Sequence, residues 1–450
     1  MAHSSDLDHL FSPRSIAVVG ASNKPGKMGN LFMQRLAAQF RGKLYAVNPG
    51  AREVAGVPAH RRVEDLPDGI DMLIVLVPAD GLVAVAEACR PGQVRFLLAV
   101  PSGFAEVPGD GAALQQKLVA AARARGTRVL GPNIVGVMNG VLGLNASMMP
   151  ELPPGGPGLS CLTQSGGFGM ALSMYALDHD MRFAKFCDIG NTADLDAPEL
   201  LEFLAHDADT HVIGLFLESV RDPAWFRRAL ETAAARKPVI LTAVGVTAAG
   251  RRASLAHLGI AAEAAIVSEM PSKNFLVAET GLDLLHRSRA LLWQRMAAGR
   301  RVAIVTGTGG IGAELADLAL GHGLEVPSMS PALQQRLGKH LPYYAGMKNP
   351  IDCTPIWWDY PKIYPAVLDE LAQSGEADLA IVSITDVAAT LADLAAAIAQ
   401  WTQGPQKLPI VVYWGARHRD HANMMLIERA GVPCYPTTRE AVSAAAALAG

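Results

Sequence analysis

The stretch SIAVVGASNKPGKMG, residues 15–29, has the pattern of a buried β-strand, a glycine-containing turn and the start of a helix. A short run of small and β-branched apolar residues is typical of a strand covered on both faces, as in a parallel sheet. A turn between strand and helix directs backbone N–H groups and the positive end of the helix dipole toward one point. The stretch therefore predicts a doubly wound α/β fold with a nucleotide or phosphate ligand at the turn.

The same alternation of strand and helix patterns continues along the chain. Short apolar runs alternate with amphipathic segments rich in alanine and leucine, which is typical of βαβ units. The proline- and glycine-rich stretch MMPELPPGGPG, residues 148–158, indicates a linker. We predict three α/β domains, at residues 1–147, 158–290 and 300–450.

Length, composition and charge exclude several classes of protein. A chain of 450 residues is too long for one hydrophobic core, and its 50% hydrophobic content excludes a disordered protein. A net charge of −3 gives no broad positive surface for nucleic acid or anionic lipid. No apolar run has the length of a membrane span, and MAHSSDLDHLF lacks the features of a signal peptide. The five scattered cysteines form no CxxC pair, so we expect a cytoplasmic protein with neither disulfides nor a metal site.

One internal repeat concerns two glycine-rich turns. TQSGGFGMAL, residues 163–172, and TGTGGIGAEL, residues 306–315, share threonine, glycine and leucine at matching places. Each follows a predicted strand and opens a predicted helix, which makes it a candidate anion site. Such turns recur in any α/β protein. Two copies that open separate domains nevertheless favour one anion shared between them.

The first turn fits a dinucleotide-binding dehydrogenase poorly. Its glycines, at positions 20, 26 and 29, do not have the GxGxxG spacing. The second strand ends in Asn48-Pro49, where an NAD site has an acidic residue for the ribose hydroxyls. Lys24 and Lys27 indicate either a ligand with additional phosphates or solvated loop charge.

A single histidine, His257, lies in the small and apolar stretch RRASLAHLGIAA, residues 251–262. A lone histidine in such surroundings is more often structural than catalytic. An imidazole can also act as a nucleophile or as a carrier of a transferred group, provided that a neighbour fixes its tautomer. The residues of this stretch leave both interpretations open.

Eight segments occur in order along nearly the whole chain: SIAVVGASNKPGKMG, AVNP, PSGFAE, GPNIVGVMN, TQSGGFG, DIGNTADLDAPELLEFLAHD, LFLES and KNPIDCTP. Taken together, they resemble the NDP-forming acyl-CoA synthetases, relatives of the succinyl-CoA synthetase α subunit and of ADP-forming acetyl-CoA synthetase. The resemblance implies a Rossmann-like CoA-binding domain followed by two flavodoxin-like, doubly wound domains.

The resemblance implies an acid–thiol ligase that converts carboxylic acid, CoA and ATP into acyl-CoA, ADP and phosphate. The reaction would pass through an acyl phosphate and a phosphohistidine, and His257 would be the phosphoryl carrier. Where the family has a Ser-His-Thr-Gly-like turn, this chain has Ala256-His257-Leu258-Gly259, so both hydroxyls are missing. Glu218 matches the glutamate that hydrogen-bonds the other ring nitrogen.

The resemblance also implies the binding residues. Those expected along CoA are Gly20, Ser22, Lys27, Asn48, Pro49, Pro78, Ser102 and Asn133. Those expected around phosphate are Gln164, Ser165, Gly166, Gly167, Thr308, Gly309, Gly310 and Ile311.

The family's nucleotide site belongs to an ATP-grasp module, which the resemblance places on a β-type partner subunit in an α2β2 or similar assembly. ATP, ADP and Mg²⁺ are therefore expected on that partner. No segment of this chain has a Walker-type lysine loop. The altered histidine turn keeps open an alternative, a non-catalytic CoA-binding or regulatory protein with the same fold.

Overall fold

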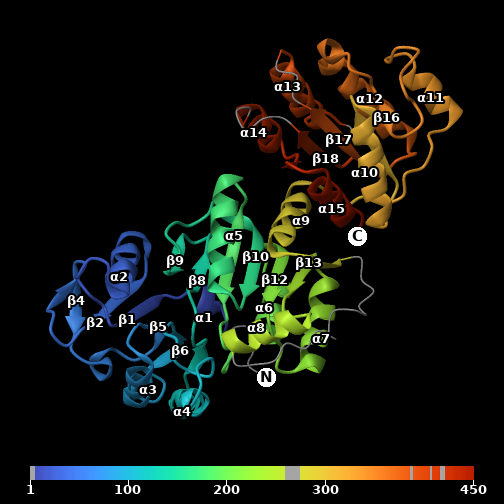
Figure 1. The fold of residues 1–450 in the computed structure, drawn as a ribbon. Helices are drawn as coiled ribbons and strands as arrows, with labels where there is room; N and C mark the ends of the chain where they lie inside the picture. The colour runs from blue at the N-terminus through green and yellow to red at the C-terminus, as the bar shows by residue number, and fades with distance from the viewer. Residues whose placement is uncertain (1–5, 259–273, 386–388, 406–407, 416–420) are drawn as a thin grey trace. The chain divides into compact units, whose positions relative to one another are not determined.

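The computed structural model of the protein describes residues 6–258, 274–385, 389–405, 408–415 and 421–450. The chain forms two compact units, Met1–Pro271 and Ser272–Gly450. In each unit, helices cover sheets that are mainly parallel, which confirms the predicted α/β class (Figure 1).

The first sheet of unit Met1–Pro271 is doubly wound, with strand order β3-β4-β2-β1-β5-β6-β7. Its strands are β1 (Ser15–Val19), β2 (Lys43–Val47), β3 (Glu53–Val54), β4 (Val57–His60), β5 (Ile70–Val75), β6 (Val94–Ala99) and β7 (Arg128–Leu130). Its helices are α1 (Asp8–Phe11), α2 (Met28–Gln39), α3 (Ala79–Ala88) and α4 (Gly111–Ala124). Since β1 pairs in parallel with both β2 and β5, the strand order reverses at β1. The carboxyl ends of these strands form the crevice where such sheets bind ligands.

The central strands of this sheet are buried along their whole length. Every residue of β1 and every residue of β5 is buried. Full burial explains why the sequence of β1 is continuously apolar instead of alternating with polar residues.

The second sheet of this unit contains strands in the order β13-β12-β10-β11-β8-β9. They are β8 (Gly136–Asn139), β9 (Leu144–Ser147), β10 (Gly155–Thr163), β11 (Phe183–Asp188), β12 (Thr210–Leu217) and β13 (Val239–Ala243). The helices are α5 (Gly166–Asp178), α6 (Ala197–His206), α7 (Pro223–Ala234) and α8 (Ala248–Leu258). The central strand β10 pairs in parallel with β11 and β12.

The β8–β9 hairpin lies in the second sheet, although the sequence analysis placed residues up to 147 in the first domain. β8 pairs antiparallel with β11, and all residues of both hairpin strands are buried. A buried hairpin of small and apolar residues needs a neighbouring strand for its backbone groups, and the edge of β11 supplies one. The first sheet therefore ends with β7, before the hairpin begins.

Unit Ser272–Gly450 contains a parallel sheet with the order β16-β15-β17-β18-β19. Its strands are β15 (Val302–Thr306), β16 (Ile351–Asp352), β17 (Leu379–Thr385), β18 (Ile410–Gly415) and β19 (Cys434–Tyr435), and β14 (Phe275–Val277) precedes them in the chain. The helices are α9 (Gly281–Trp293), α10 (Gly309–Gly321), α11 (Pro331–Leu337), α12 (Tyr360–Ser374), α13 (Leu391–Thr402), α14 (His421–Arg429) and α15 (Thr438–Ala449). Ala290 of α9 shares a hydrophobic core with α15, so the expected domain end at residue 290 falls inside a helix of this unit.

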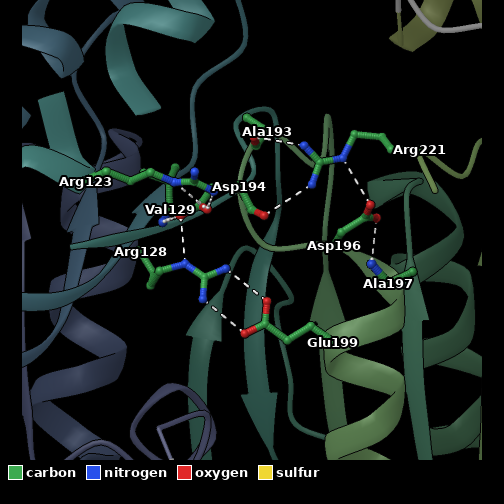
Figure 2. A network of polar contacts seen from close by, with 9 residues as sticks. All are labelled: Arg123, Arg128, Val129, Ala193, Asp194, Asp196, Ala197, Glu199 and Arg221. Atoms are coloured by element: carbon green, nitrogen blue, oxygen red, sulfur yellow. Dashed lines mark hydrogen bonds and ion pairs between the residues drawn. The ribbon is translucent and has the colours of Figure 1, made fainter. Parts of the chain in front are cut away.

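A network of ion pairs connects the two sheets of unit Met1–Pro271 (Figure 2). The carboxylate of Asp194 is fully buried and accepts hydrogen bonds from Arg123 at 2.6 Å and Arg128 at 3.0 Å. It also accepts the backbone N–H of Val129 at 2.8 Å. Arg128 forms a bidentate pair with Glu199 of α6, at 2.9 and 3.0 Å. The four charged residues line a cavity of about 790 Å³ and tie α4 and β7 to α6.

Candidate functional site

The loops that were expected to bind CoA meet at one edge of the first sheet. They follow the carboxyl ends of β1, β2, β5, β6 and β7, which run parallel. The residues that these loops carry are Gly20, Ser22, Lys27, Asn48, Pro49, Pro78, Ser102 and Asn133. The structure therefore brings the whole expected set to the carboxyl edge of the first sheet, where parallel sheets of this kind bind ligands.

Two glycines allow α2 to begin directly against the first loop. Gly20 has φ of +87°, a left-handed conformation that favours glycine. A Cβ atom on Gly29 would lie 1.9 Å from the carbonyl oxygen of Gly20, so no side chain fits there. This close approach places the amino end of α2 in the crevice, and α2 has no acidic residue in its first turn. Lys27, at the N-cap of α2, is exposed, so this end of the helix is strongly positive.

The Asn48 side chain holds two of these loops together. Its Nδ2 donates to the carbonyl of Ala21 at 2.7 Å. Its Oδ1 accepts the backbone N–H groups of Gly50 and Ala51, at 2.8 and 2.9 Å. Since both the nitrogen and the oxygen of its carboxamide are hydrogen-bonded, Asn48 fixes the loop after β1 relative to the loop after β2.

The α5 helix begins with backbone N–H donors that point out of its amino end, along the helix axis. The hydroxyl of Thr163 accepts the N–H of Ser165 at 2.9 Å, and Ser165 caps the N–H of Phe168 at 3.3 Å. Gly166 and Gly167 are the first two residues of the helix, so their N–H groups have no acceptor within it. No acidic side chain lies in the first turn. Two such N–H groups together with the helix dipole make this helix start a candidate anion site.

The α10 helix of the other unit begins in the same way. The hydroxyl of Thr306 accepts the N–H of Thr308 at 3.1 Å, as Thr163 does in the first copy. Thr308 is the N-cap but makes no side-chain capping bond, and its buried hydroxyl has no partner among the described residues. Gly309, Gly310 and Ile311 therefore present three N–H groups that no side-chain cap satisfies.

An aspartate lies beside each glycine-rich helix start, a feature that the sequence analysis missed. Asp188 ends β11, and its Oδ2 lies 3.5 Å from the position of a Cβ on Gly166. Asp352 ends β16, and its Oδ2 lies 3.1 Å from the corresponding position on Gly309. Both strands are parallel neighbours of the strand before the helix. The sequence signal was available in DIGN and DCTP, each of which begins with an aspartate at a strand end.

Gln164, which was expected near phosphate, contacts the backbone that carries Glu218. Its backbone N–H donates to the carbonyl of Phe216 at 3.1 Å. Its Oε1 accepts the backbone N–H groups of Glu218 and Ser219, at 2.7 and 2.9 Å. Glu218 follows β12 and is only 7% exposed, so the contact fixes the backbone that carries its carboxylate.

The expected phosphoryl carrier, His257, belongs to the last turn of α8. Its side chain, with those of Ala256 and Leu258, lies outside what the structure describes, as does Gly259. The neighbouring Ser254 is buried. The structure therefore places the α8 backbone in the same unit as Glu218 and the α5 helix start.

No described helix is both long enough and apolar enough to span a membrane. The described side chains also contain no group of three or more histidine, cysteine, aspartate or glutamate residues arranged to hold a metal ion. All five cysteines are buried free thiols.

Comparisons with known proteins agree with this geometry. The family model of a CoA binding domain matches residues 14–140, and that of a succinyl-CoA ligase-like flavodoxin domain matches residues 156–286. The alpha subunit of ADP-forming acetate–CoA ligase II of Pyrococcus furiosus is 32% identical over 448 residues, covering 98% of this chain and 97% of that protein. The chain belongs to the ADP-forming acetate–CoA ligase family. The resemblance inferred from the motifs is thereby confirmed.

Members of the ADP-forming acetate–CoA ligase family match along the whole chain. The alpha subunit of ligase I of Pyrococcus furiosus is 33% identical, covering 98% of this chain and 97% of its own length. A solved acetyl-coenzyme A synthetase 1 of Ca. Korarchaeum cryptofilum, in complex with phosphate and ADP, matches with a TM-score of 0.88. It is 30% identical and covers 98% of this chain and 96% of its own. The family relationship therefore includes unit Ser272–Gly450.

Proposed function

We propose that this chain is the CoA- and acyl-side subunit of an ADP-forming acid–thiol ligase. The overall reaction converts a small carboxylic acid, CoA and ATP into acyl-CoA, ADP and phosphate. One observation carries the proposal: a chain that matches alpha subunits of such ligases over 98% of its length has the loops expected to bind CoA and the glycine-rich start of α5 in one compact unit.

The crevice of the first sheet would bind CoA chiefly through its phosphates. The amino end of α2 supplies unpaired backbone N–H groups, and Lys27 supplies a full positive charge. Asn133, which follows β7, would lie nearer the thiol. Asn48 and Gly29 would act indirectly, by holding the loops in the conformation that admits the ligand.

The helix starts of α5 and α10 would each bind phosphate oxygens. In phosphoryl transfer the protein acts mainly by positioning and by stabilising charge on the equatorial oxygens. Preorganised N–H groups at Gly166, Gly167, Gly309 and Gly310 supply that stabilisation without reorganisation.

His257 would carry the phosphoryl group between the acyl side and the nucleotide. Phosphate attacks the acyl carbon of acyl-CoA and displaces the CoA thiolate, which gives an acyl phosphate. The imidazole then attacks phosphorus and releases the carboxylate. Glu218 would accept a hydrogen bond from the other ring nitrogen and so hold the tautomer whose free nitrogen attacks. The fixed backbone of Glu218 supports this role.

The nucleotide half of the reaction would take place on a second subunit. The relatives from Pyrococcus furiosus are named alpha subunits, which implies that each has a partner chain. We assign ATP, ADP and Mg²⁺ to an ATP-grasp partner of β type, in an α2β2 or similar assembly. The reaction from acyl-CoA to phosphohistidine requires only residues of the present chain.

That half-reaction tests the proposal without the partner. The purified chain is mixed with acetyl-CoA and inorganic phosphate, and the released CoA is measured with a thiol reagent. We expect a burst of CoA that requires phosphate and approaches one equivalent per active chain. CoA binding without any phosphate-dependent release would instead identify a non-catalytic CoA-binding protein.

A further inference from the structure

A buried carboxamide connects the CoA crevice to the α5 anion site. Asn191 lies three residues after the end of β11 and is 1% exposed. Its Nδ2 donates to Oε2 of Glu106 at 2.5 Å and to Oε1 of Gln115 at 3.1 Å. Its Oδ1 accepts from Nδ2 of Asn133 at 3.4 Å. Asn191 thus contacts the loops after β6 and β7 and the helix α4.

Glu106 shapes the loop that follows β6. Its Oε1 accepts the backbone N–H groups of Gly103 and Phe104, at 2.5 and 3.1 Å. Burial alone would raise the pKa of Glu106, but the hydrogen bonds from Asn191, Gly103 and Phe104 outweigh it and hold the pKa below its usual value. Near neutral pH, Glu106 is therefore an ionised acceptor with one oxygen on the loop and the other on Asn191.

The loop that carries Asn191 is also attached to the start of α5. Asp188 accepts the backbone N–H groups of Val135 and Gly190, at 2.7 and 3.2 Å, and lies beside Gly166. The N–H of Ile189 donates to the carbonyl of Thr163, just before the anion site, at 2.8 Å. The segment from Asp188 to Asn191 therefore spans the distance between the two sites.

Backbone contacts strengthen this connection. The N–H of Asn191 donates to the carbonyl of Pro132 at 3.0 Å. A Cβ atom on Gly190 would lie 2.3 Å from that same oxygen, so only glycine allows the segment to lie so close. The connection therefore combines close backbone packing at Gly190 with hydrogen bonds at Asn191.

We propose that Asn191 and Glu106 are positioning residues that fix the CoA-binding loops relative to the phosphate-binding start of α5. This inference rests on the proposed function, in which the thiol of CoA and the acyl phosphate react between those two sites. The rate of a reaction between two bound reactants depends strongly on their relative position, and a misplacement of about 1 Å can lower that rate about 100-fold. The bridge would therefore act on the acyl-transfer rate more than on the binding of CoA.

The chemistry of the bridge suggests a swap experiment. Asn191→Asp places a carboxylate against the carboxylate of Glu106, which repels the loop without changing the volume of either side chain. In the double variant Glu106→Gln/Asn191→Asp, a carboxamide again donates to a carboxylate across the same contact. Rescue by this exchange would show that the contact between residues 106 and 191, and not either side chain alone, determines the rate.

The test uses the full chain, acetyl-CoA and phosphate, and records the CoA burst at saturating acetyl-CoA and the CoA dissociation constant by calorimetry. We expect Asn191→Asp to slow the burst at least about ten-fold while the dissociation constant changes less than about three-fold. The double variant should recover most of the rate. Asn139→Asp is the matched control, because Asn139 is equally buried and donates to the carbonyl of Phe11 away from both sites.

Failure of the proposed function and failure of the positioning role would give different results. If the unaltered chain releases no CoA in response to phosphate, the proposed function fails. If the unaltered chain reacts but Asn191→Asp keeps its rate, the positioning role is wrong. It is also wrong if the double variant is as slow as the single variant, or if Asn139→Asp slows the burst equally.

Discussion

Gly167 and Gly310 are second residues of their helices, and neither needs to be glycine for packing. A Cβ atom on Gly310 would meet nothing within 4 Å, and one on Gly167 would only reach the hydroxyl of Ser165 at 4.0 Å. Glycine is also the poorest helix former after proline. A ligand that approaches the backbone closely explains glycine at both positions.

We therefore predict that Gly310→Ala leaves the fold as stable as before, or up to about 1 kcal/mol more stable, while it weakens the response to phosphate. The added methyl group would occupy the space of a phosphate oxygen. Thermal unfolding and the phosphate concentration for half-maximal CoA release measure the two effects. Gly321→Ala, at the other end of α10, is the control, since its Cβ would also be in open space. An unchanged phosphate response in Gly310→Ala would remove α10 from the site.

Lys27, the exposed N-cap residue of α2, carries a positive charge at the proposed CoA site. Lys27→Glu should weaken CoA binding, since a charge-assisted hydrogen bond contributes about 1.5–3 kcal/mol. Calorimetric titration with CoA measures the change. Lys43→Glu provides the control, because Lys43 is also exposed but begins β2, at the opposite edge of the sheet. Equal affinities of the two variants for CoA would contradict the assignment of Lys27.

At this scale the sequence predicted which loops carry the candidate residues but not which protein groups their side chains contact. Asn48 was expected to contact CoA, whereas its amide is engaged by Ala21, Gly50 and Ala51. Gln164 was expected to bind phosphate, and its backbone N–H donates to the carbonyl of Phe216. Its side-chain oxygen accepts the backbone N–H groups of Glu218 and Ser219. Gly50 and Ala51 follow Asn48 in its own loop, but Ala21, Phe216, Glu218 and Ser219 are distant in sequence from the side chains that they contact. A contact with a distant backbone group leaves no local pattern in the sequence.

At the scale of elements, strand-to-helix turns were predictable and the position of the hairpin was not. Apolar strands followed by glycine-rich turns identify β1, β10 and β15 without any tertiary information. The β8–β9 hairpin follows the first sheet in sequence, but β8 pairs with β11, which lies further along the chain, beyond β10 and α5. Its strands are too short to show which sheet they join.

The contacts of Asp194 predict that a buried charge contributes to the stability of unit Met1–Pro271. Asp194→Asn should lower the free energy of unfolding near neutral pH by about 1.5–3 kcal/mol, since hydrogen bonds to a charged group are lost. Asp68→Asn is the control, because Asp68 pairs with Arg90 on the surface and is 72% exposed. Urea unfolding of each full-length variant gives the values.

The same network predicts a pH dependence. Burial alone would raise the pKa of Asp194, but hydrogen bonds from Arg123 and Val129 and the charge of Arg128 hold it below its usual value. A pKa that is lowered in the folded state stabilises the folded protein at pH values above the unfolded pKa of about 3.9. This contribution is lost as the pH falls from that value through the lower pKa of the folded state. The stability difference between the parent chain and Asp194→Asn should therefore shrink on acidification from pH 7 to pH 3. A difference that stays constant over this range would show that the carboxylate's charge contributes nothing.

At the scale of the whole molecule, the two units repeat one arrangement. A central strand, β10 or β15, leads into a glycine-rich helix start, and an aspartate ends the neighbouring strand in each unit. The sequence repeat predicted the shared helix starts. It did not predict the paired aspartates, because the strands that carry them, FAKFCD and ID, have little in common.

The proposed division of labour between this chain and a nucleotide-binding partner is most directly tested by the source of a phosphoryl group on His257. The purified chain is incubated separately with acetyl-CoA plus labelled inorganic phosphate and with γ-labelled ATP plus Mg²⁺, and the labelled peptide is identified. We predict acid-labile, base-stable label on His257 from acetyl-CoA and phosphate, none from ATP without a partner, and none in His257→Asn, which should still bind CoA. Label from ATP on the rigorously purified chain, or undiminished label in His257→Asn, would contradict the account.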